Sequence, residues 1–176
     1  MPIELPSNIS RAREFHRQLL AKGFDHGCAE VSLTALGASF LSEDITELQA
    51  RTLDTLVQNA GFRINWTITT TNSLEAEDFD LLLLGKINPH QAYPNEEIVG
   101  FIWTEDYPDG SGHMMAILPF FNESEKYWCV DSALIMSSIQ LTAENLAHHA
   151  NQVLAQGGKF QISQLVRLAD PDLEEI

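Results

Sequence analysis

Residues 24–37 read FDHGCAEVSLTALG, a stretch that places a cysteine at the start of a short apolar helix. From Cys28 onward apolar residues recur at helical spacing, up to a stop signal at Gly37. A thiol in the first turn of a helix lies among unpaired backbone N–H groups, at the positive end of the helix dipole, and both stabilise the thiolate. Cysteine is also often buried as a small hydrophobe, so the rest of the chain has to decide between a nucleophile and a core residue.

The length and composition of the chain predict one folded domain. Its 176 residues are 44% hydrophobic, enough for a core without metal or disulfide bridges, so we expect a single domain over residues 1–176 with an acidic tail from about residue 170. A net charge of −15 with only ten Lys and Arg argues against nucleic acid or an anionic membrane as partner. The acidity is compatible with basic peptide substrates. The oligomeric state is not encoded in any pattern that we recognise.

The N-terminus has neither the basic start nor the apolar core of a secretory signal, and no apolar run is long enough to span a membrane. We therefore expect a cytoplasmic protein. The sequence does not decide against export by a route that needs no signal peptide.

Helical periodicity dominates the first third of the chain, and strand-like alternation begins after Gly61. The predicted helices span residues 7–22, 28–37, 42–61 and 142–156. The predicted strands span residues 62–69, 98–104, 113–120, 126–131 and 160–168, and residues 80–84 fit either a helix end or a buried strand. Helices followed by antiparallel strands predict an α+β fold in which N-terminal helices pack on the sheet.

Two further residues have the chemistry that a nucleophilic thiol needs. His113 opens a strand after a glycine-rich turn that we place at residues 105–112, and Asp131 ends the next strand. A thiol needs a base within hydrogen-bonding reach, and the base needs a third group that fixes its tautomer. In a hairpin of this length, His113 and Asp131 are expected to be cross-strand neighbours. With the first turn of the Cys28 helix at that end of the sheet, the sequence predicts a Cys28–His113–Asp131 triad.

The order and placement of these residues resemble the papain-like cysteine peptidases. Residues 27–37, 112–117 and 127–132 are similar to the motifs of double-glycine leader peptidases from bacteriocin exporters and of their stand-alone relatives. The chain also looks like the type III secreted cysteine proteases and glutamine deamidases of pathogenic bacteria. The resemblance implies a papain-like fold, a bacterial source and hydrolysis of amide bonds through the triad without a cofactor. The family's oxyanion-hole glutamine is missing, because Lys22 stands at its place and the nearest upstream glutamine is Gln18.

Three functions remain open. The first is a thiol peptidase that cleaves a peptide or protein substrate, and the second is a glutamine deamidase that uses the same triad on a protein. The third is a non-catalytic domain that binds a peptide or protein on the peptidase fold. The missing glutamine favours the third function, whereas the intact cysteine, histidine and aspartate argue against it.

Other residues with reactive side chains have simpler interpretations. Cys129 lies inside a strand and is expected in the core, and His26 is expected in a loop. Adjacent helix residues such as His148 and His149 point about 100° apart and cannot easily share one metal ion. The glycines of residues 110–112 do not open a helix and so do not form a phosphate-binding loop. The sequence predicts neither a metal site nor a cofactor.

Overall fold

The computed structural model describes residues 7–23, 28–38, 56–58, 60–70, 75–83, 93, 96–110, 112–121, 126–131 and 140–168. In this part of the chain the helices are α1 (Ser7–Ala21), α2 (Cys28–Ala35), α4 (Ala76–Leu83) and α5 (Ala143–Ala155). The strands are β1 (Arg63–Thr70), β2 (Glu97–Asp106), β3 (Gly112–Phe121), β4 (Lys126–Asp131), β5 (Gln140–Thr142) and β6 (Lys159–Arg167).

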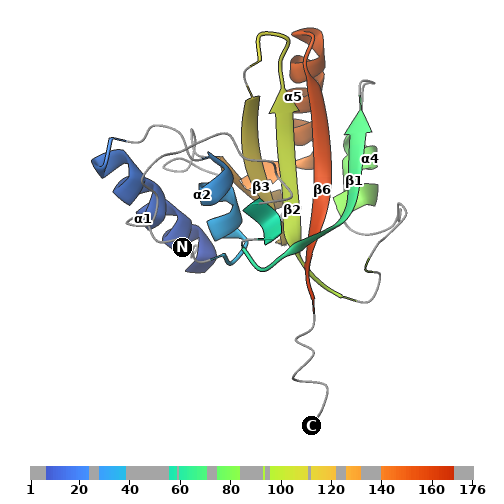
Figure 1. Ribbon diagram of the computed structural model, residues 1–176. Coiled ribbons are helices and arrows are strands. Elements are labelled where there is room, and N and C mark those ends of the chain that lie inside the picture. The colour runs from blue at the N-terminus through green and yellow to red at the C-terminus, as the bar shows by residue number, and fades with distance from the viewer. Residues whose placement is uncertain are drawn as a thin grey trace, which may run out of the picture.

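The described strands form one six-stranded sheet in the order β1-β6-β2-β3-β4-β5, and every neighbouring pair is antiparallel. Helices α1 and α2 cover one face of this sheet, and α4 and α5 cover the other (Figure 1). The α+β class and the packing of N-terminal helices on an antiparallel sheet are thus confirmed. None of the described helices is both long and apolar enough to cross a membrane.

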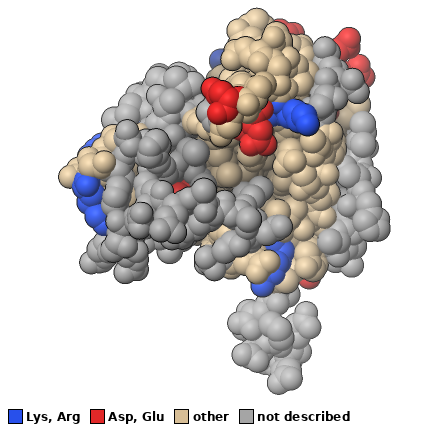
Figure 2. Space-filling model, turned by 45° about the horizontal axis from the view of Figure 1, so that its top comes forward, with Lys and Arg blue, Asp and Glu red and all other residues tan. Residues whose placement is uncertain are grey.

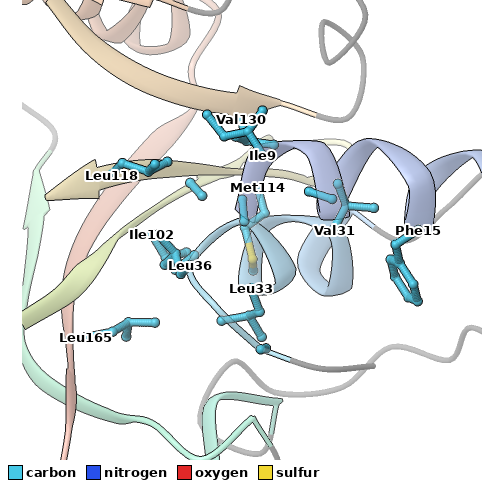
Figure 3. Packing of buried hydrophobic residues seen from close by; sticks show 14 of the residues in the cluster. Ile9, Phe15, Val31, Leu33, Leu36, Ile102, Met114, Leu118, Val130 and Leu165 are labelled. Carbon is cyan, nitrogen blue, oxygen red and sulfur yellow. The ribbon is translucent and has the colours of Figure 1, made fainter. Parts of the chain in front are cut away.

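Helix α2 is buried in the layer between α1 and the sheet (Figure 3). Val31, Leu33 and Val130 of β4 are fully buried in this cluster, which also contains Met114 of β3. A helix that is buried all round must satisfy its polar side chains internally. In α2, the Thr34 hydroxyl donates to the Glu30 carbonyl at 2.7 Å, and the Ser32 hydroxyl donates to the Met114 carbonyl at 3.5 Å.

The opposite layer is built on stacked aromatic rings. Phe79 of α4 stacks on Trp103 of β2, with ring centroids 5.7 Å apart, and Trp103 stacks on Phe160 of β6 at 4.9 Å. Helix α5 closes this layer and begins with a capping box, in which Thr142 and Asn145 each accept a hydrogen bond from the other's backbone N–H.

Most predicted elements are found within one or two residues of their expected bounds. Of the two alternatives left open for residues 80–84, the helix end is the one found, since residues 80–83 end helix α4, and strand β5 was not expected. Strand β2 continues to Asp106, two residues into the predicted turn. The extra length arises because Glu105 and Asp106 pair with His113 and Gly112. The predicted helix 42–61 lies mostly outside the described residues, of which 56–58 are helical, and the acidic tail lies wholly outside them.

Candidate catalytic site at one end of the sheet

Helix α2 begins at Cys28, as predicted, and packs against β3 and β4. Leu36, the residue that follows the helix, lies near Gly100 and Ile117, since a Cβ placed on Gly100 would come within 2.4 Å of Leu36 Cδ2 and 3.0 Å of the Ile117 carbonyl oxygen. One turn after Cys28, Ser32 lies at the level of Met114. The first turn of α2 is therefore directed toward the end of the sheet at which β3 begins.

His113 is the second residue of β3 and is half-buried. Asp131 is the last residue of β4, and its partner across the hairpin is Met115. His113 and Asp131 are thus diagonal neighbours, two residues from the direct pairing that the sequence suggested. The direct partner of His113 is Glu105, on the other side of β3.

Side-chain alternation places His113 on the face that α4 and α5 cover. Met114 belongs to the cluster under α1 and α2, whereas Met115 belongs to the cluster under α4 and α5. His113 therefore shares the face of Met115 and of its direct partner Glu105. The backbones of α2 and β3 meet at this end of the sheet, but α2 and the His113 ring approach it from opposite faces. The side chains of Cys28 and Asp131, like all of His26, lie outside the described part of the structure, so the triad stays a prediction.

A buried polar cluster surrounds the direct partner of His113. The Glu105 carboxylate accepts hydrogen bonds from Trp103 Nε1 at 3.0 Å, from the Tyr107 hydroxyl at 2.8 Å and from His149 Nε2. Only 4% of the Glu105 side chain is exposed, against 41% of the His149 side chain on α5. The cluster thus connects a buried carboxylate to an imidazole that reaches the surface.

The hydrogen bonds of this cluster keep Glu105 ionised. Burial by itself raises the pKa of the Glu105 carboxyl, but the bonds from His149, Tyr107 and Trp103 and the charge of His149 outweigh burial and lower it. The same contact acts on the phenol: burial, together with the hydrogen bond to Glu105 and its charge, raises the pKa of Tyr107 to about 12. Glu105 is therefore a fixed negative charge at neutral pH, and Tyr107 a fixed donor.

The sequence contains a local signal for part of this cluster. Trp103, Glu105 and Tyr107 alternate along the chain, so they share one face of an extended segment. The turn predicted at residues 105–112 includes Glu105, and no pattern in the sequence links it to His149. Among the described residues, no group of three or more His, Cys, Asp or Glu side chains is arranged to hold a metal ion.

Cys129 takes the place predicted for it. Its side chain is 2% exposed in the cluster under α4 and α5, and its Sγ lies 3.7 Å from the Tyr127 carbonyl oxygen. A thiol in this environment is a packing residue.

An open cavity of about 570 Å³ lies at the same end of the sheet as His113. It is lined by Tyr107, Pro108 and Asp109 of the turn that precedes β3 and by Gln156 at the end of α5. Figure 2 brings this end of the molecule forward and shows acidic side chains at the surface there, next to basic ones. The cavity offers an aromatic wall, an amide and one carboxylate to a ligand that approaches β3 from this end.

Comparison with known proteins gave little. No protein-family model matches the chain, and no curated protein matches it. Among solved structures, the chain is similar to the Pseudomonas avirulence protein AvrPphB, with a TM-score of 0.35 and 10% sequence identity, over 88% of this chain and 69% of that one. We therefore infer function from the residues of this chain and not from that likeness.

Proposed function

We propose that the protein is a thiol hydrolase of amide bonds, a peptidase-like enzyme of papain-like fold in which Cys28 is the nucleophile and His113 the base. The observation that carries this function is the start of α2 at Cys28, on a helix that packs against the two strands that hold His113 and Asp131. Burial of residues 30–35 of α2 supports it, because a helix fixed on the sheet holds its first turn in a defined place.

In the proposed mechanism, His113 takes the proton of the Cys28 thiol, and the thiolate attacks the carbonyl carbon of an amide. Asp131 orients the ring and stabilises the imidazolium. His113 then protonates the leaving nitrogen as the C–N bond breaks, and the acyl group remains on sulfur as a thioester. Water, deprotonated by His113, hydrolyses the thioester and returns the free thiol.

The oxyanion hole of this mechanism differs from that of the family it resembles. Lys22 is exposed in the turn that follows α1, and Gln18 is exposed on α1. We assign one oxyanion donor to the backbone N–H of Cys28, because the first N–H groups of a helix have no partner within the helix.

The substrate in this proposal is a peptide or protein, with a preference for basic residues near the scissile bond. Two features support that preference: Asp109 in the cavity wall and the net charge of −15. The same chemistry would release ammonia from a glutamine side chain, so deamidation is the alternative reaction at this site.

The test is acylation by p-nitrophenyl acetate, which needs no knowledge of the natural substrate. We expect a burst of p-nitrophenol equal to the protein concentration and an acetyl group on Cys28 by peptide mass spectrometry. Cys28→Ala should abolish the burst, and His113→Ala should slow it at least tenfold, since a positioned base contributes about 100-fold or more. A folded protein that shows no burst would refute the enzyme. If the burst is seen, a peptide library separates the two reactions. A peptidase produces new amino termini, whereas a deamidase releases ammonia.

One observation favours a second candidate, a non-catalytic domain that binds a peptide or protein. Helix α2 and the His113 ring approach the end of the sheet from opposite faces. This candidate predicts binding of basic peptides at the cavity, unchanged by Cys28→Ala and weakened by Asp109→Asn.

A further inference from the structure

His113 has an acidic neighbour that is better placed in the sheet than Asp131. Glu105 and His113 are direct partners across β2 and β3, so their Cβ atoms lie about 5 Å apart on the same face. Asp131 is opposite Met115, one pleat farther along. The carboxylate nearest to His113 by register is therefore that of Glu105.

We infer that Glu105 is a positioning residue for His113, an acidic partner that stabilises the imidazolium form of the proposed base in addition to Asp131. This inference rests on the proposed function for its role in catalysis, but the coupling between the two side chains is measurable without it. An opposite charge within about 4–6 Å favours the charged form of a titratable group. The effect is larger at a half-buried ring than in water, because the surroundings screen less.

Glu105 is suited to this role because its carboxylate is held in place. Trp103 donates to one of its oxygens from the same strand, Tyr107 donates to the other from the turn that follows β2, and His149 donates from α5. The carboxylate cannot rotate away without leaving the buried Trp103 Nε1 without its acceptor. A buried, fully bonded carboxylate provides a fixed field at His113.

His149 determines how much of that field reaches His113. It contributes a compensating positive charge to Glu105 when it is protonated, and it also repels a proton on His113. The other titratable groups on this face in the described residues include Tyr107, which donates to Glu105, the buried Cys129, and Tyr127, whose hydroxyl donates to Asp80 of α4 at 2.7 Å. His148 is the exposed neighbour of His149 on α5. Glu105 and His149 should therefore act on His113 with opposite signs.

The experiment follows the ring C–H resonances of His113 by NMR against pH, assigned with His113→Gln. Glu105→Gln keeps the shape of the side chain and removes its charge, so we expect the His113 titration midpoint to fall by about one pH unit. His149→Gln keeps a donor to Glu105 and removes the compensating charge, so the midpoint should rise. Tyr107→Phe removes a neutral donor and is the matched control, with the smallest change of the three.

A midpoint that does not move in folded Glu105→Gln would overturn the inference. If that variant does not fold, the exposed His149 side chain still allows the test, and an unmoved midpoint in His149→Gln would overturn it as well. Failure of the proposed function looks different, because the NMR titration needs no reaction. If the reactivity of the Cys28 thiol does not change in His113→Ala, the proposed enzyme is refuted. If the titration midpoint of His113 does not change in Glu105→Gln, only the role of Glu105 is refuted.

Discussion

At the scale of single residues, the polar chemistry of this protein centres on one buried carboxylate. Glu105 is ionised in the core because Trp103, Tyr107 and His149 all donate to it. A buried donor that loses its acceptor costs about 1–3 kcal/mol, whereas an exposed partner can turn to water. Replacing different members of the cluster should therefore lower the free energy of unfolding by different amounts.

We expect Glu105→Ala to lower the free energy of unfolding by about 3 kcal/mol, because Trp103 Nε1 and the Tyr107 hydroxyl both lose their acceptor. His149→Gln should cost about 1 kcal/mol or less, because the 41% exposed side chain is replaced by another donor. Urea denaturation at pH 7 measures both. Equal costs for the two variants would contradict the cluster as the structure shows it.

The lowered pKa of Glu105 predicts how stability depends on pH. Since its folded pKa lies below the ordinary value of 4.5, the ionised carboxylate contributes stability that is present above that value and is lost as the pH falls through the folded pKa. Below pH about 4.5 the wild type should therefore lose stability more steeply than Glu105→Gln. Urea midpoints between pH 3 and pH 7 measure the two slopes, and parallel slopes would show that Glu105 has an ordinary pKa.

At the scale of elements, the position of α2 depends on how closely the residue that follows it, Leu36, approaches β2. Gly100 has a φ of 152° and no room for a side chain, since its Cβ would lie 2.4 Å from Leu36 Cδ2. Leu36 follows the last turn of the helix that Cys28 begins. One glycine thus allows the chain just after α2 to approach the sheet closely, at the opposite end of the helix from the candidate nucleophile.

Gly100→Ala should destabilise the protein by about 2–3 kcal/mol, through overpacking of a filled core. It should also displace α2 and so change the reactivity of Cys28. Gly61→Ala is the matched control, because Gly61 also has a positive φ of 85° but nothing lies within 4 Å of its Cβ. The control should cost only about 1–2 kcal/mol of backbone strain and leave Cys28 unchanged. A change in Cys28 reactivity of the same size in both variants would contradict the role of the close approach.

At the scale of the whole molecule, local signals predicted the elements, and non-local packing decided the site. The start of α2 at Cys28, the bounds of β4 and the cap of α5 at Thr142 follow from caps and alternation, which are written in neighbouring residues. The β2–β3 register depends on how far β2 continues, and no local pattern fixes that. Glu105 and His149 meet only because α5 packs on the sheet, so the contact with His149 could not be predicted, whereas the alternation of Trp103, Glu105 and Tyr107 is a local signal for the rest of the cluster.

The central claim is that Cys28 is a nucleophile activated by His113, and the pH dependence of its alkylation by iodoacetamide tests it most directly. The experiment compares two proteins, one with His113 and one with His113→Ala. Both carry Cys129→Ala. That change removes the second thiol without adding a hydroxyl to the core. The account predicts a titration midpoint for Cys28 well below the free-thiol value of about 8.5, and its return toward about 8.5 in His113→Ala. A midpoint near about 8.5 in both proteins would contradict it.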